Sequence, residues 1–133
     1  DGPELVGLRI LTVEDDADSR EMVEMVLRAR GAEVVAVSSV REAMDVLNSP
    51  GWQPHLLVSD LGMPEEDGYD LIRKLRAGTI ANGIKLPAIA ITGYAGKEES
   101  QRSLSAGYQL QLSKPVNWPE LIEAIVRIAR NGT

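Results

Sequence analysis

Short apolar runs alternate five times with segments of helical periodicity, and this alternation limits the fold more than any other feature of the chain. The apolar runs have the length of strands and occupy residues 8–13, 33–37, 56–59, 88–92 and 109–112. Continuous apolar strands that alternate with helices are typical of a parallel sheet covered by helices on both faces. The sequence therefore predicts an α/β fold with five parallel strands and right-handed crossover connections.

The first and last helical segments have well-defined apolar stripes. In the first segment we expect a core-facing stripe of Met22, Met25, Val26 and Ala29. Asp16 or Asp18 can cap the start of this helix, and Gly31 suits its end. The last helix opens at residues 117–119 and has a stripe of Leu121, Ile125 and Ile128. Both helices are predicted to lie with these stripes against the sheet.

The three middle helical segments are less uniform. Residues 39–42 have the form of a capping box before the second helix. The third helix ends at Gly78, and its predicted inward residues are Leu71, Ile72 and Leu75. The fourth segment, residues 97–106, contains Leu104 as its single large apolar residue. We expect this fourth helix to be loosely anchored and mobile, because most helical stability comes from a packed apolar face.

Composition excludes several classes of protein. The chain has 133 residues and no cysteine, which fits one domain without disulfides or thiolate chemistry. A formal charge of −6 argues against a general nucleic-acid-binding surface. No apolar stretch is long enough to span a membrane, and the first residues do not resemble a signal peptide. We interpret residues 8–130 as one soluble, cytoplasmic domain, with a lead at 1–7 and a tail at 131–133.

Three carboxylates stand where apolar runs end. Glu14 and Asp15 follow the first run, and Asp60 follows the third, just before a turn at residues 61–64. Carboxylates placed close together raise one another's pKa, so this arrangement is costly unless a cation neutralises it. Mg²⁺ prefers such oxygen ligands and also coordinates phosphate oxygens. The sequence therefore predicts a Mg²⁺ site, which Mn²⁺ could also occupy, and phosphate chemistry.

Two further polar residues map to the same edge of the predicted sheet. Thr92 ends the fourth strand, and Lys114 follows the fifth. In open parallel sheets, ligands bind beyond the carboxyl ends of the strands, where the strand order reverses. Taken singly, Asp60 could be a turn residue, Lys114 a surface lysine and Thr92 a plain strand residue. Their joint placement favours a functional site.

The chain resembles the receiver domains of two-component signalling over residues 8–130. The resemblance rests on four motifs in order, each at the end of its own strand: Val13-Glu14-Asp15-Asp16, Ser59-Asp60-Leu61-Gly62-Met63-Pro64 with Asp67-Gly68, Ile91-Thr92-Gly93 and Ser113-Lys114-Pro115. It implies a flavodoxin-like, doubly wound fold with strand order 2-1-3-4-5. It also implies a domain that catalyses its own phosphorylation and dephosphorylation and does not turn over an external substrate.

By the same resemblance, Asp60 would accept a phosphoryl group. Asp15 would bind the metal directly, Glu14 mainly through water, and Gly62 through its main-chain carbonyl. Lys114 and the Thr92 hydroxyl would contact phosphoryl oxygens, and Thr92 would move when the phosphate arrives. The Lys114–Pro115 peptide bond would be cis.

The implied partners are a histidine kinase or a histidine phosphotransfer domain, acting in a phosphorelay. Output would be through the face formed by the fourth helix, fifth strand and fifth helix, with no effector domain after the fifth helix. The sequences of residues 4–11 and 63–69 resemble those of receivers attached to hybrid sensor histidine kinases, and a stand-alone regulator is the alternative. Homodimerisation stays open, and neither nucleic acid nor membrane contact is expected.

Three positions matter for how far the chain follows the family pattern. Gln111 stands where many receivers carry an aromatic switch residue, and Tyr108, three positions earlier, need not replace it. Tyr94 is bulky and Gly62 has no side chain, at two positions that border the path of hydrolytic water in the family. We therefore expect slow to moderate self-dephosphorylation.

Other readings remain alongside the receiver hypothesis. A Mg²⁺-dependent phosphohydrolase with an aspartyl nucleophile typically has a second aspartate two residues after the first, where this chain has Gly62. A degenerate receiver would act as a constitutive binding module. His55, the single histidine, precedes the third strand at the end opposite Asp60 and is interpreted as structural or surface.

Overall fold

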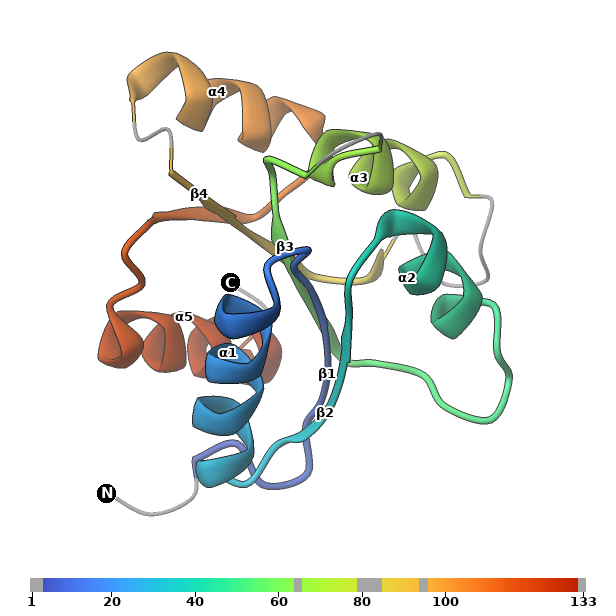
Figure 1. The fold of residues 1–133 in the computed structure, drawn as a ribbon, viewed down its shortest axis with the longest axis vertical. Coiled ribbons are helices and arrows are strands. Elements are labelled where there is room, and N and C mark those ends of the chain that lie inside the picture. Colours follow the sequence, from blue (N-terminus) through green and yellow to red (C-terminus); the bar gives the residue numbers. More distant parts are fainter. Residues whose placement is uncertain (1–3, 64–65, 79–84, 94–95, 132–133) are drawn as a thin grey trace.

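The fold is a five-stranded parallel sheet with the strand order β2-β1-β3-β4-β5 (Figure 1). A computed structural model describes residues 4–63, 66–78, 85–93 and 96–131. The strands are β1 (Arg9–Val13), β2 (Glu33–Val37), β3 (Leu56–Asp60), β4 (Ala88–Thr92) and β5 (Leu110–Ser113). The helices are α1 (Ala17–Ala29), α2 (Val40–Leu47), α3 (Gly68–Arg76), α4 (Lys97–Ala106) and α5 (Trp118–Asn131). The predicted fold class and strand order are confirmed, and the predicted strand ends shift by one residue at β1, β3 and β5.

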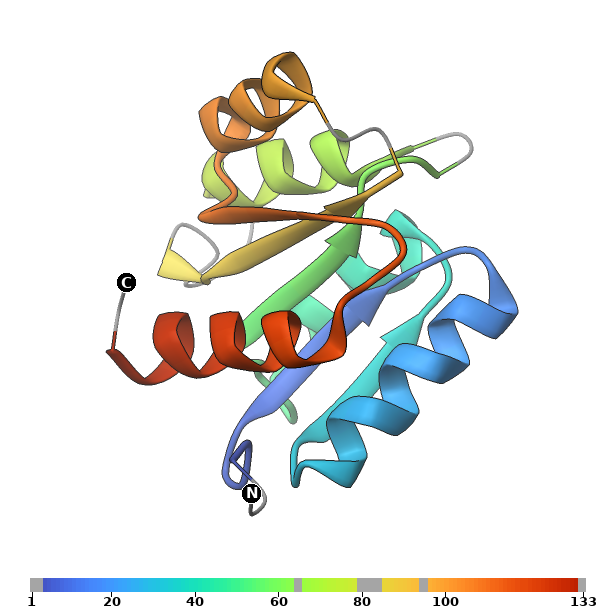
Figure 2. The ribbon, with the colours of Figure 1, turned by 90° about the vertical axis from the view of Figure 1, so that its left-hand side faces the viewer.

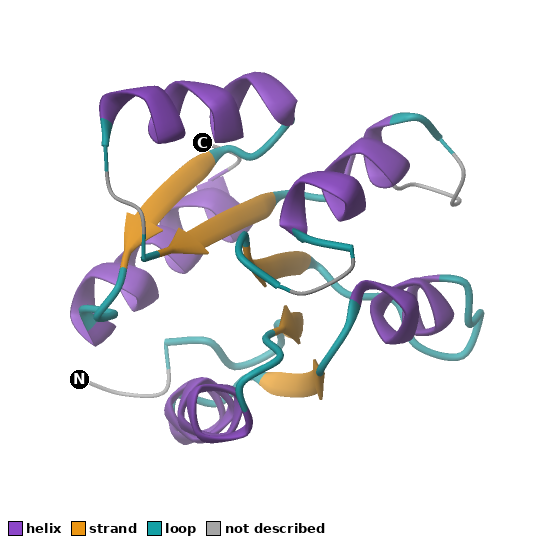
Figure 3. Ribbon diagram, turned by 45° about the horizontal axis from the view of Figure 1, so that its top comes forward, coloured by secondary structure: helices purple, strands orange, loops and turns teal. Residues whose placement is uncertain are grey.

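Two hydrophobic clusters fill the two faces of the sheet. Successive strand residues point to opposite faces, so that Ile10 belongs to one cluster and Leu11 to the other. The first cluster contains the buried residues of α1 and α5, and the second contains those of α2 and α3. Figures 2 and 3 show α1 and α5 together on one side of the sheet. Because both faces are covered, the inner strands β1, β3 and β4 consist mainly of apolar residues without alternation.

The predicted core stripe of α1 is wrong by one position around the helix. Val23 and Leu27 are buried, whereas Met22 and Met25 are 49% and 58% exposed. Of the expected stripe, Val26 alone packs against the core. The reason is that two stripes with the same helical spacing overlap in this segment, one rich in methionine and one in branched residues. Periodicity cannot choose between them, because the docking angle of the helix on the sheet decides which stripe is covered.

The helix ends follow local hydrogen bonding. Asp16 caps α1 by accepting from the Ser19 amide, so that Asp16 and not Asp18 is the cap. Gly31 and Gly78 follow α1 and α3 with positive φ, as their positions predicted. The expected capping box of α2 is only half formed, because Glu42 accepts from the amide of Ser38, the residue before the cap. A complete capping box occurs instead at α3, between Asp67 and Asp70.

Helix α4 buries little apolar surface. Leu104 is 45% exposed, and the buried residue of this helix is Ser103. The Ser103 hydroxyl donates to the Gln111 side-chain oxygen at 2.7 Å. A hydrogen bond to β5 thus takes the place of an apolar anchor, and the greater mobility of α4 stays a prediction.

Candidate functional site

Parallel pairing brings the polar strand ends to one edge of the sheet. In the registers of the paired strands, Val13 lies opposite Ser59, Asp60 opposite Ile91, and Thr92 opposite Ser113. Glu14 and Lys114 each follow directly after such a strand end. All strands point the same way in Figure 2, so these residues share the carboxyl edge of the sheet, as the sequence predicted.

Three carboxylates gather at this edge. One ligand oxygen each from Glu14, Asp15 and Asp60 lies within 4.8 Å of the others. Glu14 and Asp60 are buried, at 7% and 5% exposure, and Asp15 is exposed. Loss of hydration raises the pKa of Asp15, and the hydrogen bond and negative charge of the adjacent Glu14 raise it further. The cluster is therefore an electrostatically unfavourable group of acids that a cation would relieve.

Lys114 supplies one such cation from the protein itself. Its Nζ donates to Glu14 Oε1 at 3.0 Å and to Asp60 Oδ2 at 3.1 Å. Partial burial acts to lower the pKa of Lys114, but the two carboxylates outweigh burial and raise it. Lys114 therefore stays charged and bridges the ends of β1 and β3.

The acidic group also fits a hard metal ion. Carboxylate oxygens are the ligands that Mg²⁺ prefers, and three carboxylates exceed the single positive charge of Lys114. The backbone amide of Gly62 donates to Asp60 Oδ1 at 3.1 Å and so orients this carboxylate. The donor set is thus suitable for Mg²⁺ or Mn²⁺, with Asp15 as its most accessible member.

Two residues that support the site were not assigned this function from the sequence. The Arg20 guanidinium of α1 donates to the carbonyls of Glu14 and Asp15, at 3.0 and 3.3 Å, and fixes the backbone that carries both acids. Gly68 opens α3 so close to β3 that an added Cβ would lie 2.6 Å from the Asp60 carbonyl oxygen. The Asp67-Gly68 pair of the motif could have indicated the importance of Gly68. Nothing in the sequence could have indicated Arg20, because basic residues are common in first helices.

Residues 10–126 match the response regulator receiver domain. The chain belongs to this family. It is 40% identical to an uncharacterized 14.6 kDa protein of Leptolyngbya boryana, with 91% of this chain and 89% of that protein aligned. It is 34% identical to hybrid signal transduction histidine kinase D of Dictyostelium discoideum, over 93% of this chain but only 8% of that kinase. This chain is thus similar to one part of a much longer signalling protein.

Solved receiver structures have the same fold. The receiver domain of the sensor histidine kinase PA1611 of Pseudomonas aeruginosa aligns with a TM-score of 0.81 and 29% identity, over 95% of this chain and 99% of that domain. That structure is described with a magnesium ion coordinated in its active-site cleft. This chain is therefore a receiver domain of two-component signalling, and its acidic cluster Glu14, Asp15 and Asp60 is a group that could hold a metal.

The remaining positions singled out in this receiver lie as follows. Thr92 is fully buried at the end of β4, and its carbonyl accepts the Lys114 amide at 2.8 Å. Gln111 accepts the Ser103 hydroxyl and so connects β5 to α4. The Lys114–Pro115 bond is cis, as expected. Tyr94 lies outside the described residues.

An apolar groove of about 350 Å³ borders the acidic cluster of the receiver. Its polar lining residues are Glu14, Asp18, Ser19 and Lys114, and its apolar lining residues are Met22, Val23, Ile91, Pro115, Val116 and Trp118. The Met22 side chain is therefore exposed at the edge of a groove that adjoins the site. Sequence reasoning missed this groove because it treated Met22 as a core residue.

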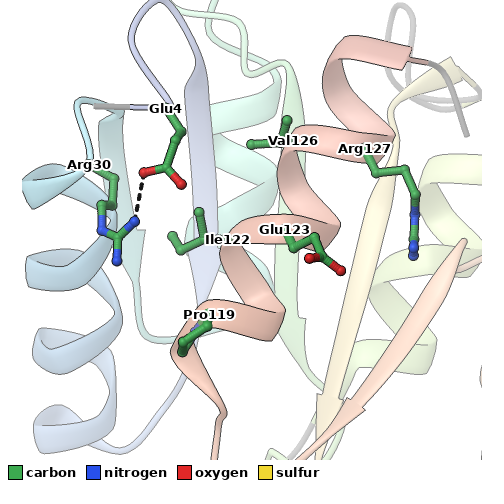
Figure 4. A pocket seen from close by; sticks show the side chains of 7 residues that line it. All are labelled: Glu4, Arg30, Pro119, Ile122, Glu123, Val126 and Arg127. Carbon is green, nitrogen blue, oxygen red and sulfur yellow. Dashed lines mark hydrogen bonds and ion pairs between the residues drawn. The ribbon is translucent and has the colours of Figure 1, made fainter. Parts of the chain in front are cut away.

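A second hollow of the receiver, of about 500 Å³, lies between the end of α1 and α5 (Figure 4). The Glu4 carboxylate accepts from Arg30 at 2.6 Å on one side, and Ile122 and Val126 line the other. None of its lining residues belongs to the acidic cluster.

Across the described residues, no helix has the length and apolar character needed to cross a bilayer.

Proposed function

We propose that Asp60 of this receiver accepts a phosphoryl group from a histidine kinase or a histidine phosphotransfer protein. The observation that carries the proposal is the placement of the Asp60 carboxylate, buried between the Lys114 ammonium and two further acids at the strand edge. A carboxylate is a competent nucleophile when its charge is offset and its attack is in line. The family membership supports this reading.

In the transfer, a carboxylate oxygen of Asp60 forms a bond to phosphorus. The bond between phosphorus and the donor's imidazole nitrogen breaks, and that nitrogen keeps the electron pair. The Gly62 amide, at 3.1 Å from Oδ1, holds the carboxylate in one orientation. Lys114 already donates to Oδ2 and can move its hydrogen bond to a phosphoryl oxygen. We assign the Thr92 hydroxyl to a second phosphoryl oxygen, so that its movement reports the phosphate.

We assign Glu14, Asp15, Asp60 and the main-chain carbonyl of Gly62 as the residues that hold Mg²⁺, or Mn²⁺ in its place. When bound, the ion would neutralise the carboxylates and the charge of the transferred group. The magnesium described for the PA1611 receiver supports this assignment. Arg20 does not contact the ion in this proposal, but its hydrogen bonds to the carbonyls of Glu14 and Asp15 hold the backbone that carries these two ligands.

We propose that the phosphodonor protein docks on the groove beside the cluster. The groove is apolar, adjoins Lys114 and is bordered by the exposed Met22. A donor helix that covers it would bring a histidine next to Asp60. We expect Met22→Glu to slow transfer from a protein donor and to leave phosphorylation by acetyl phosphate unchanged.

The output surface in this proposal is the face of α4, β5 and α5. Leu104 of α4 is a large apolar side chain that is available to a partner, at 45% exposure. The signal would be read by a downstream protein in the cytoplasm or by a second copy of the receiver. Residues 8–130 form the functional unit, and Tyr94 and Gly62 give a slow to moderate loss of the phosphoryl group.

The test is the intact mass of the protein after incubation with Mg²⁺ and acetyl phosphate. We expect one phosphoryl adduct that requires Mg²⁺, is absent in Asp60→Asn and persists in the matched control Asp45→Asn, an exposed residue of α2. No adduct on folded, Mg²⁺-loaded protein would instead indicate a degenerate receiver that binds constitutively. Turnover of a generic phosphate ester would indicate a hydrolase.

A further inference from the structure

Tyr108 makes a buried hydrogen bond that joins the α4–β5 turn to the start of α3. Its side chain is 3% exposed, and its hydroxyl donates to the Gly68 carbonyl at 2.7 Å. The two residues are 40 positions apart in the sequence. A buried hydroxyl that finds its acceptor in this way fixes the relative position of the two segments.

The same turn also bonds to the other end of α3. Arg76, the last residue of α3, donates to the Gly107 carbonyl through Nε at 3.1 Å and through a terminal nitrogen at 2.8 Å. The Gly107–Tyr108 turn therefore contacts both the first and the last residue of the helix. Figures 1 and 2 show α4 and α3 side by side above the sheet.

The first residue of α3 in turn lies against the segment that carries Asp60. The Gly68 amide donates to the Leu61 carbonyl at 3.3 Å, and the Gly68 Cα leaves no room for a Cβ beside the Asp60 carbonyl. The Asp60 carboxylate is held from the same segment, by the Gly62 amide. A shift of Gly68 would therefore move the Asp60 carbonyl and the Leu61 backbone that follows it.

We propose that Tyr108 is a positioning residue for the chemistry at Asp60, acting through the Gly68 carbonyl. Gln111 has no aromatic ring to connect β5 to the site, and its side chain accepts a hydrogen bond from Ser103 of α4. Tyr108 provides an aromatic connection from the neighbouring turn. In this arrangement the α4–β5 turn is connected to the site through α3. The inference rests on the proposed function of Asp60.

The chain offers a matched control in Tyr69. Tyr69 and Tyr108 belong to the same hydrophobic cluster, and each is 3% exposed. The Tyr69 hydroxyl makes no hydrogen bond of standard geometry among the described residues. It lies near Glu99 of α4 and does not donate to the backbone of Asp60 or Gly68. Tyr69→Phe and Tyr108→Phe therefore remove the same atom from the same cluster, but only Tyr108→Phe removes the bond to Gly68.

The experiment measures two quantities for both variants well below their unfolding temperatures. The first is the rate of phosphorylation by acetyl phosphate at saturating Mg²⁺. The second is the Mg²⁺ concentration for half-saturation, followed by tryptophan fluorescence in a Trp52→Phe background, in which the remaining Trp118 lines the groove beside the cluster. In Tyr108→Phe we expect the rate to fall about fivefold and half-saturation to rise about threefold, which is the scale of one hydrogen bond. Tyr69→Phe should stay within about twofold of the wild type.

Two results would overturn the inference. One is a Tyr108→Phe protein that matches the wild type in both quantities, and the other is an equal loss in Tyr69→Phe, which would assign the effect to general packing. If the wild type accepts no phosphoryl group, the proposed function fails by itself. The Mg²⁺ titration then decides whether Tyr108 positions the acidic cluster.

Discussion

The Lys114 ammonium lies 3.1 Å from Oδ2 of Asp60, although 54 positions separate the two residues in the sequence. The contact crosses from the end of β5 to the end of β3. It gives the buried Asp60 carboxylate a partner that belongs to the protein itself. Because a buried carboxylate without a partner is costly, Lys114 has a structural function besides its proposed contact with phosphate.

Lys114→Met should therefore destabilise the metal-free protein. Glu14 and Asp60 would lose their shared cation, but the Lys114 side chain is 34% exposed, so that water screens part of the loss. We expect the free energy of unfolding to fall by about 1–2 kcal/mol. Urea unfolding in the presence of EDTA measures it. Lys74→Met is the control, because its ion pair with Glu66 is exposed on both sides and should contribute less than about 1 kcal/mol. Equal losses in both variants would contradict the prediction.

Asp15→Asn should stabilise the metal-free protein at neutral pH. The pKa of Asp15 is raised in the folded state above its ordinary 3.8, mainly by loss of hydration and then by Glu14. The folded state therefore holds this proton more tightly than the unfolded state. As pH rises from the unfolded-state pKa of Asp15 through its higher folded-state pKa, the contribution of Asp15 to stability falls. Removing the charge should raise the melting temperature in EDTA.

Added Mg²⁺ should reverse that order, because binding to the folded state stabilises the wild type and the variant lacks a ligand. Thermal unfolding with and without Mg²⁺ makes the comparison. Asp18→Asn, an exposed change in the first turn of α1, serves as the control and should keep the wild-type response to Mg²⁺. A variant that Mg²⁺ stabilises as much as the wild type would remove Asp15 from the proposed ligand set.

Gly68→Ala should be destabilising even though alanine favours helices. Its Cβ would lie 2.6 Å from the Asp60 carbonyl oxygen and 3.0 Å from the Leu61 Cα, and both are backbone atoms that cannot rotate away. We expect a loss of about 1–3 kcal/mol in urea unfolding, together with slower phosphorylation. An added Cβ at Gly51 meets no atom within 4 Å, so Gly51→Ala should change stability by about 0.5 kcal/mol or less. Equal effects at both glycines would argue against close packing of α3 on β3.

His55 should make the stability of the protein depend on pH below neutrality. Partial loss of hydration, and then the nearby Arg9, lowers the pKa of the exposed His55 below 6.5, and its Nδ1 accepts the Arg9 amide at 2.9 Å. The unfolded state therefore binds this proton first, and stability is lost as pH falls through 6.5 toward the folded pKa. Because the chain has one histidine, its NMR titration is unambiguous. A titration midpoint above 6.5 would contradict the prediction, and His55→Gln should flatten the pH dependence.

Much of the fold and of the site edge could be predicted from the sequence, because both depend on strand ends. The apolar runs locate the strands, and parallel pairing then places Glu14, Asp60, Thr92 and Lys114 at one edge whatever the loops do. The predictions for individual helix faces were weaker. Met22 and Met25 have the correct spacing for a core stripe, yet Val23 and Leu27 fill the core. A rotation of one residue about a helix axis is decided by packing against the sheet, which local periodicity does not contain.

The contacts that join distant segments were not predictable either. Nothing around Tyr108 indicates that its hydroxyl meets the Gly68 carbonyl, because that bond depends on how far α3 leans toward the α4–β5 turn. Arg20 was missed for the same reason, since its acceptors are carbonyl groups of a loop. Side-chain bonds to main-chain atoms leave no pattern in the sequence when the two partners lie on different elements.

The spread of the site along the chain also bears on when the protein becomes active during folding. The Lys114 contact to Glu14 spans 100 positions, so that the complete site, with Lys114 bridging Glu14 and Asp60, forms only when β1, β3 and β5 are all in the sheet. Contacts of such long range close late, because the entropy of ordering the intervening chain must first be overcome. A nascent or misfolded chain therefore carries every acid of the site but not its geometry. Only a fully folded molecule therefore presents the Lys114 bridge to Glu14 and Asp60, on which the proposed phosphorylation depends.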